Sequence, residues 1–247
     1  MTNPLVLKLS SFVDLSPAEI ERVNRLSINM KTHRAHRTLI RQGDRPEVVF
    51  LLLKGWAYRY KVLADGGRQI VAYLLPGDLC DVQIFILKEM DHAIGLLSDA
   101  EVAEIPKQQM MELFDDCPNL ARGLWWSTMV DQGTLREWIA NVGRRDAFTS
   151  IAHLFCELWV RMKMVGLVED HSIALPLTQD ELADTVGLTS VHVNRTLQLL
   201  RSKGLIESQQ RRLFIPDIKQ LMDVAGFDPN YLHLARRLPR TAERGYG

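Results

Sequence analysis

The stretch 177–200 constrains the fold more than any other part of the chain, because it specifies two short helices and the turn between them. Thr178 followed by Glu181 forms a capping box, which predicts that a helix begins there. Gly187 ends this helix and supplies a sharp turn. Ala183 is small enough to let a second helix cross closely. The segment therefore predicts two helices that meet at a steep angle.

The second helix is predicted to start at Thr189 or Ser190, since either side chain can cap it. Its apolar residues Val193, Leu197 and Leu200 fall on one face, which indicates that this face packs inward and leaves the opposite face free. A helix, a glycine turn and a second helix in this register predict a helix-turn-helix unit.

Two strand-like runs follow, 204–208 and 212–215, joined by the polar turn 209–211. They predict a β-hairpin wing beside the two helices. The formal net charge of the chain is zero, so any nucleic-acid surface must be local. Such a local surface exists here, because only Glu207 opposes a group of five cations: Arg195, Arg201, Lys203, Arg211 and Arg212.

A winged helix-turn-helix places its second helix in the major groove of double-stranded DNA, with phosphates held by surrounding cations. Arg195 can pair with guanine and Asn194 with adenine, and each pairing contributes about 1–3 kcal/mol of base discrimination. His192 is expected to contact phosphate or solvent. The predicted DNA-binding residues are Ser190, Val191, His192, Asn194, Arg195, Arg201, Lys203 and Arg211. Two alternatives stay open: a helical hairpin used for protein contacts, and an Arg195 that only bridges an acidic neighbour.

The N-terminal half has a different pattern. Between about His36 and Ile105, short apolar runs alternate with turn signals every 10 to 12 residues or so, which is typical of an antiparallel sandwich or jelly roll. Asp65-Gly66-Gly67 is the clearest hairpin turn among them. Before this region, Ser16 and Glu19 predict a short capped helix.

A long helix is predicted at about 119–144, with a coiled-coil-like seam that suggests a dimer helix. The seam consists of Leu124, Thr128, Asp131, Leu135, Trp138 and Val142. Because Thr128 and Asp131 are polar, a helix packed only on its own domain remains an alternative. We predict an α+β chain with an N-terminal antiparallel β-roll and long helix (1–145), a winged helix-turn-helix domain (146–225) and a C-terminal tail (226–247).

Composition excludes several other classes. No apolar run is long enough for a membrane span, and the first residues lack a signal-peptide pattern, so we expect a cytoplasmic protein without membrane contact. Cys80, Cys117 and Cys156 are scattered, which argues against both a disulfide scaffold and a cysteine-held iron–sulfur cluster. We expect no cofactor and no metal.

The chain resembles the Crp/Fnr family of bacterial transcription regulators over nearly its whole length. The resemblance implies a cyclic-nucleotide-binding-type β-roll acting as a sensor, a dimerisation helix, a hinge near Asp146 and a C-terminal winged helix. It also implies a homodimer on pseudo-palindromic promoter sites that contacts or occludes RNA polymerase. The segments that carry the resemblance are Arg41-Gln42-Gly43-Asp44, Leu53-Lys54-Gly55, Tyr73-Leu74-Leu75-Pro76-Gly77-Asp78, Glu101-Val102-Ala103-Glu104-Ile105 and Leu177 to Leu205.

Departures from the family pattern bear on the ligand. Members that bind cyclic AMP carry a Gly-Glu pair and an Arg followed by Ser or Thr, where this chain has Asp81-Val82 and Asp91-His92-Ala93. A cyclic phosphate would meet two carboxylates and, on this reading, no arginine, so we predict that cyclic AMP does not bind. Residues 1–35 contain no cysteine, so the cysteine cluster of the oxygen-sensing branch is also absent.

A different effector pocket is predicted from Asp81, Asp91, His92, Leu135 and Trp138. The alternatives are ordinary loop residues, or a metal site that includes Cys80. A redox role for Cys80 or Cys156 is a weaker idea, because lone cysteines in apolar runs are usually inert.

The predicted reading helix departs from the family as well. Val191 stands where many relatives have a glutamate, so it can offer only apolar contact, for instance to a thymine methyl.

An enzyme is the remaining alternative. A metal-dependent jelly-roll enzyme usually presents several histidines from neighbouring strands, but only His92 lies inside the predicted roll, with His33 and His36 before it. We therefore predict that the chain is not an enzyme.

Overall fold

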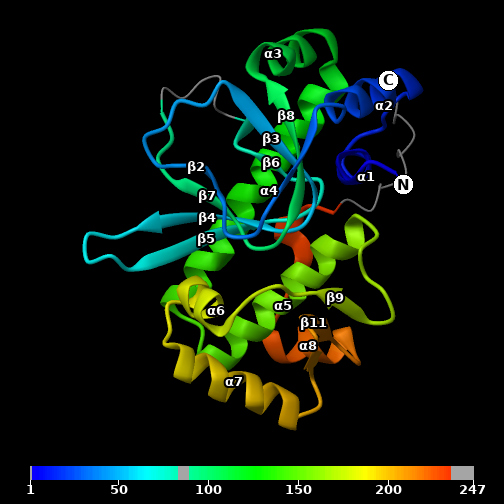
Figure 1. Ribbon diagram of the computed structural model, residues 1–247. Coiled ribbons are helices and arrows are strands. Elements are labelled where there is room, and N and C mark those ends of the chain that lie inside the picture. Colours follow the sequence, from blue (N-terminus) through cyan, green and yellow to red (C-terminus); the bar gives the residue numbers. More distant parts are fainter. Residues whose placement is uncertain (1, 83–88, 235–247) are drawn as a thin grey trace, which may run out of the picture.

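The structure, a computed structural model, describes residues 2–82 and 89–234. Antiparallel sheets form the N-terminal part, and helices with one small sheet form the C-terminal part (Figure 1). The long helix α4 (Pro118–Gly143) runs along both parts and connects them. No helix among the described residues has the length and apolar character needed to cross a membrane.

Two four-stranded sheets build the N-terminal β-roll, as the sequence predicts. One sheet has the strand order β1-β8-β3-β6 and the other β2-β7-β4-β5, and all pairs are antiparallel. Alternate apolar side chains of both sheets face one buried core. The strands are β1 (Met30–His33), β2 (Thr38–Ile40), β3 (Val48–Lys54), β4 (Ala57–Val62), β5 (Arg68–Leu74), β6 (Leu79–Cys80), β7 (Ala93–Leu96) and β8 (Ala100–Pro106).

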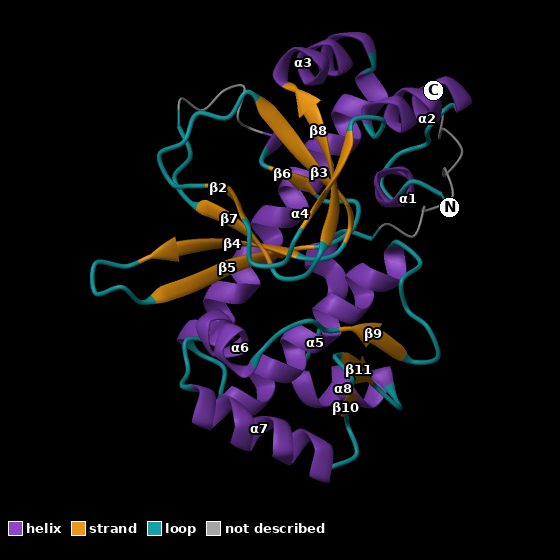
Figure 2. Ribbon diagram, in the orientation of Figure 1, coloured by secondary structure: helices purple, strands orange, loops and turns teal. Residues whose placement is uncertain are grey.

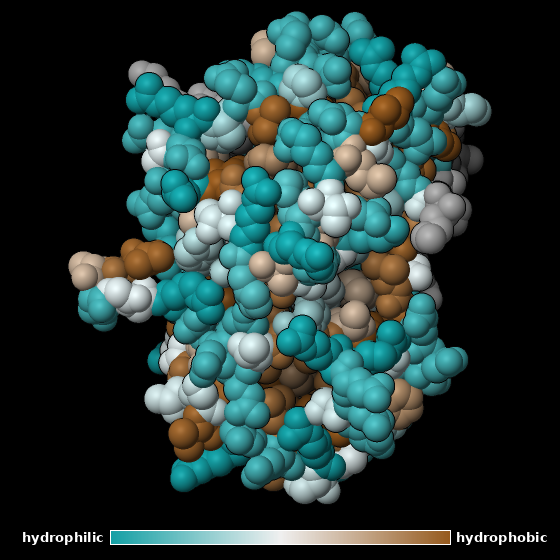
Figure 3. Space-filling view, in the orientation of Figure 1, coloured by the Kyte–Doolittle hydropathy of each residue, from teal (hydrophilic) through white to brown (hydrophobic). Residues whose placement is uncertain are grey.

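The predicted hairpin turn at Asp65-Gly66-Gly67 joins β4 to β5. Gly66 has a φ of +85°, a left-handed conformation that favours glycine. The hairpin projects from the molecule, and its tip is apolar and exposed at Val62 and Leu63 (Figure 3).

Two helices precede the roll. The predicted one is α2 (Pro17–Leu26), where both hydrogen bonds of the Ser16–Glu19 capping box are present. The sequence interpretation missed α1 (Pro4–Ser10), which is capped by Asn3 and packs on α4. Lys8 of α1 forms a buried ion pair of 2.6 Å with Asp78, and this pair ties the N-terminal helix to the roll.

After the roll, α3 (Lys107–Asp116) leads into α4, whose predicted seam is only partly right. Leu124 and Trp138 are buried in the interior, whereas Leu135 and Val142 are exposed. The exposed apolar face also includes Trp125 and Ile139, each with 65% of its surface exposed. The helices before and after the roll, the roll itself and α5 cover the face that carries Leu124 and Trp138. The exposed face therefore keeps Leu135 and Val142 of the predicted seam and has Trp125 and Ile139 beside them.

The C-terminal part is built around α5 (Ala147–Met164), which Asp146 caps (Figure 2). The sequence interpretation missed β9, which adds a third strand to the predicted wing because it pairs with β11. The remaining elements are β9 (Ser172–Ala174), α6 (Gln179–Val186), α7 (Ser190–Ser202), β10 (Glu207–Gln209), β11 (Arg212–Phe214), α8 (Ile218–Ala225) and the 3-10 helix η2 (Pro229–Leu232).

The first part of the predicted C-terminal tail packs against the protein. Phe227 and Leu232 are buried, and the Tyr231 hydroxyl donates to the buried Glu157 carboxylate at 3.0 Å. Residues 235–247 of that predicted tail lie outside the described residues.

His153 on α5 should make stability depend on pH. Burial, with help from Arg145, lowers its pKa from 6.5 to about 4, although Glu137 opposes this. The unfolded chain therefore takes up the proton first, so stability is full above about pH 6.5 and falls as the pH drops toward 4. We expect a loss of about 2–3 kcal/mol over that window.

Urea denaturation at pH 7 and pH 4.5, with His153→Phe as the comparison, measures this effect. The phenyl ring can keep the edge-on contact with Phe227 and the stacking on Tyr231, but it cannot titrate. The stability difference between wild type and variant should change with pH. A difference that is the same at both pH values would contradict the expectation.

Candidate nucleic-acid interface

The turn between α6 and α7 is fixed by its local sequence. Thr178 accepts a hydrogen bond from the Glu181 amide, and the Glu181 side chain accepts one from the Thr178 amide, so the predicted capping box is present. Gly187 has a φ of +69°, and a Cβ there would lie 3.2 Å from a methyl carbon of Val142. Both the backbone conformation and the close approach of α4 therefore favour glycine at this position.

The second helix, α7, begins where the sequence predicts. Of the two possible caps, Thr189 is the one used, and it accepts a hydrogen bond from the His192 amide. The Ser190 hydroxyl donates to the Asp180 carboxylate and so links α7 to α6. Val193 and Leu200 are fully buried, which anchors the inner face of α7.

The outer face of α7 is free. Val191 has 63% of its surface exposed, and His192 and Arg195 are exposed beside it. Asn194 is half-buried on the same side. No hydrogen bond or ion pair joins the Arg195 side chain to another described residue, so the alternative of an Arg195 bridging an acidic neighbour finds no support here.

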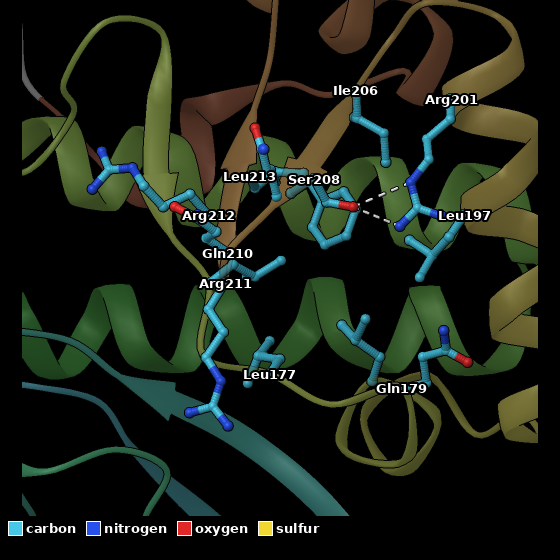
Figure 4. A pocket seen from close by; sticks show the side chains of 14 residues that line it. Leu177, Gln179, Leu197, Arg201, Ile206, Ser208, Gln210, Arg211, Arg212 and Leu213 are labelled. Atoms are coloured by element: carbon cyan, nitrogen blue, oxygen red, sulfur yellow. Dashed lines mark hydrogen bonds between the residues drawn. The ribbon is translucent and has the colours of Figure 1, made fainter.

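A groove of about 240 Å³ lies between the end of α7, the wing and the start of α6 (Figure 4). Leu197 and Leu213 form part of its apolar floor, and Gln179 and Arg211 stand on its polar rim. Arg201 donates two hydrogen bonds to Ser208, at 3.1 and 2.6 Å, and keeps its positive charge without a carboxylate partner among the described residues. A rim of this composition suits a phosphodiester.

The other cations of the wing and of the end of α7 differ in whether a carboxylate pairs with them. Gln210 and Arg211 have φ values of +50° and +60°, as a tight hairpin turn requires, and Arg211 is exposed. Lys203 is exposed at the C-terminal cap of α7. Arg212, which the sequence groups with these cations, instead pairs with Glu169 at 3.1 Å. Its charge is therefore partly neutralised within the protein.

A second cavity of about 470 Å³ lies between the roll and α4, and four of the five residues of the predicted effector pocket line it. They are Asp81, Asp91, His92 and Leu135. Trp138 is not among the lining residues, because its ring packs edge-on against Tyr73 and its Nε1 donates to Glu157 at 3.1 Å.

His92 joins two carboxylates in this cavity. Its Nδ1 lies 2.7 Å from Asp91 and its Nε2 lies 2.9 Å from Asp81. Burial alone would lower the pKa of His92, but the bonds to Asp81 and Asp91 raise it. Burial would likewise raise the pKa of Asp81, but Arg59 and His92 together hold it below its usual value.

The expectation that no arginine reaches this cavity is wrong. Arg59 and Arg161 both line it, from elements distant in sequence from the Asp81 region. Both are engaged, however. Arg59 pairs with Asp81 at 3.2 Å and Asp131 at 3.3 Å, and Arg161 pairs with two buried carboxylates. A phosphate entering here would have to compete with carboxylates for each guanidinium.

No group of three or more His, Cys, Asp or Glu side chains within 2–82 and 89–234 is arranged to hold a metal ion. Cys80 and Cys156 are buried, and burial raises the pKa of both thiols. Raised thiol pKa values disfavour the reactive thiolate, so neither cysteine has the surroundings of a redox switch.

Comparison with known proteins agrees with this architecture. Residues 30–117 match a family model described as a cyclic nucleotide-binding domain, and residues 150–224 match one described as a Crp-like helix-turn-helix domain. The transcriptional activator protein FnrL of Cereibacter sphaeroides is 28% identical over 202 residues, which are 80% of this chain and 81% of FnrL.

Two further relatives point the same way. The nitrogen fixation regulation protein FixK of Bradyrhizobium diazoefficiens is 28% identical over 170 residues, which are 68% of this chain and 70% of FixK. The solved structure of FixK2 from Bradyrhizobium japonicum has a TM-score of 0.71 at 24% identity. The match covers 79% of this chain and 96% of the FixK2 chain, so the two share a fold. The chain belongs to the Crp/Fnr family of DNA-binding transcription regulators.

Proposed function

We propose that two copies of the chain join through α4 and place two α7 helices on a pseudo-palindromic promoter site. Crp/Fnr regulators act as dimers, and the exposed seam of Leu135, Ile139 and Val142 offers the apolar surface for such a contact. The observation that carries the proposal is the free outer face of α7, which leaves Arg195 exposed and unpaired within the described chain.

Each predicted contact has a role in this proposal. Arg195 pairs with guanine and Asn194 with adenine, while Val191 touches a thymine methyl. Ser190 and His192 lie at the start of α7, near the DNA backbone. The phosphate contacts come from Arg201, Lys203 and Arg211, whose charges surround the groove and the end of α7.

Regulation is proposed to act through the cavity of 470 Å³. The domain division is residues 1–145 for sensing and 146–225 for DNA binding, with a small molecule other than cyclic AMP seated beside Asp81, Asp91, His92 and Leu135. Trp138 would support the cavity wall from behind Tyr73. FnrL carries the name of a transcriptional activator, which supports a contact with RNA polymerase rather than occlusion.

Fluorescence anisotropy with purified protein tests the proposal. The probes are a duplex from the region upstream of its own gene and a random duplex of equal length. We expect tighter binding to the upstream duplex at moderate salt, with an affinity that falls steeply as salt rises. Equal affinity for both duplexes over the whole salt range would contradict the proposal.

A further inference from the structure

Strand β5 of the N-terminal roll contacts α6, the first helix of the helix-turn-helix. Figure 1 shows α6 lying between β5 and α7. The Arg68 guanidinium of β5 donates to the Asp184 carboxylate of α6 at 2.7 Å, and both side chains are about two-thirds buried. Tyr58 accepts a second hydrogen bond from Arg68 at 3.0 Å, which holds the guanidinium in position. This ion pair joins residues from the two parts of the chain.

Two neighbours of Arg68 extend the same contact. The Gln69 side-chain amide donates to the Thr185 carbonyl at 3.2 Å. The hydroxyl of the fully buried Tyr73 lies against the Thr185 hydroxyl, which itself donates to the Glu181 carbonyl at 2.7 Å. The Tyr73 hydroxyl also lies 3.4 Å from the Glu181 carbonyl, so it contacts two residues of α6. Three successive contacts thus run from β5 along α6.

These contacts reach the reading helix through rigid links. Gly187 and the bond from Ser190 to Asp180 fix α7 to α6, and the buried side chains of both helices complete the unit. At the other end of the domain, Arg145 pairs with Glu137 at 2.7 Å and holds the start of α5 near α4. The contact of β5 with α6 is separate from this attachment, from the ion pair of Arg161 with Asp78 and from the approach of Val142 to Gly187. It joins a strand of the roll directly to the helix that precedes α7.

We propose that Arg68, Gln69 and Tyr73 are positioning residues for DNA recognition. They touch no DNA, but they fix the distance and angle between the two α7 helices of a dimer, and so select the spacing of the half-sites. This inference rests on the proposed function. It differs from that function because it assigns spacing selectivity to residues of the sensor sheet.

The physical reason is the geometry of the duplex. Half-sites read by a dimer lie about one helical turn apart, and a shift of one base pair both moves and rotates the second site. A helix-turn-helix unit that is held rigidly cannot follow that shift, so the dimer binds sites with a wrong spacing weakly. A DNA-binding unit that lacks the contacts of β5 with α6 would tolerate them better, at the cost of affinity for the right spacing.

Charge reversal and charge exchange test the inference. The variants are Arg68→Asp, Asp184→Arg and the double exchange, with Arg68→Lys as the conservative change. Lys54→Asp is the matched control, because Lys54 pairs with Glu101 inside the roll at 2.7 Å. Affinity is measured for a set of palindromic duplexes that differ only in the spacer between half-sites.

Wild type should prefer one spacer over its one-base-pair neighbours by about tenfold. Each single reversal should reduce that preference to about twofold, whereas the double exchange, Arg68→Lys and Lys54→Asp should keep most of it. Half-site preference should stay unchanged in every variant, because α7 itself is intact.

Each outcome is decisive. Single reversals that keep the wild-type spacing preference would overturn the inference, as would a double exchange that fails to restore it. If the reversals do not fold, Gln69→Ala and Tyr73→Phe take their place, and an unchanged spacing preference in both would overturn it. A wild-type protein without any preferred half-site would instead contradict the proposed function.

Discussion

Replacing Arg195 by alanine is expected to remove most of the specific affinity for promoter DNA while the protein stays folded and dimeric. A bidentate arginine–guanine contact contributes about 1–3 kcal/mol, and a dimer makes two of them, so the loss should be about 2–6 kcal/mol. Arg195 is exposed and unpaired within the described residues, so its loss should not disturb the helix. Anisotropy titrations with specific and random duplexes measure the effect.

Two comparisons isolate the role of Arg195. Arg25→Ala removes an exposed arginine on α2, far along the chain from the reading helix, and should leave binding unchanged. Lys203→Ala should weaken binding to all sequences alike and reduce the salt slope by about two, one for each copy in the dimer. An Arg195→Ala variant that keeps the wild-type preference for the promoter would refute the assigned contact.

A glutamate in place of Ile139 is expected to separate the dimer and with it abolish tight promoter binding. Ile139 lies in the exposed seam of α4, and burying such a side chain against a partner stabilises by about 1.5–3 kcal/mol in each copy. The glutamate removes that gain and brings two like charges together across the dimer. Sedimentation equilibrium should show the mass of one chain.

Ile28→Glu is the matched control, because Ile28 is 77% exposed and lies outside α4. This variant should keep the mass of two chains and wild-type DNA binding. A stable dimer in the Ile139→Glu variant would show that the seam of Leu135, Ile139 and Val142 is not the dimer contact.

Local signals made the helix-turn-helix predictable from sequence. A capping box, a left-handed glycine and an apolar register act within a few residues, so Thr178, Gly187 and Val193 take their predicted places. The roll followed from its regular turn signals for a similar reason. By contrast, β9 has three residues and no apolar alternation, and its pairing with β11 depends on chain far away in sequence.

The seam of α4 shows where periodicity alone is insufficient. Two faces of this helix carry apolar residues at heptad spacing, and only the packing of the roll and of the neighbouring helices decides which one is buried. Leu124 and Trp138 belong to the buried face. Ile139 belongs to the free one and could not be distinguished before the fold was known.

The cations of the sensor cavity could not be predicted from the sequence, because only the tertiary structure brings them to it. Arg59 and Arg161 reach Asp81 and Asp78 from β4 and α5, and no motif links these residues along the chain. The sequence placed the acidic groups of the cavity but not the cations that neutralise them. The N-terminal helix α1 left a short signal, Asn3 followed by Pro4, which could have been read as a cap.

Selection of bound duplexes from a random pool tests the central claim most directly. If paired α7 helices read DNA, the wild-type protein should enrich a two-fold symmetric motif whose half-sites lie about one helical turn, or a multiple of it, apart. The Arg195→Ala variant should lose the guanine preference within each half-site. A wild-type selection that enriches no symmetric motif over the starting pool would contradict the account.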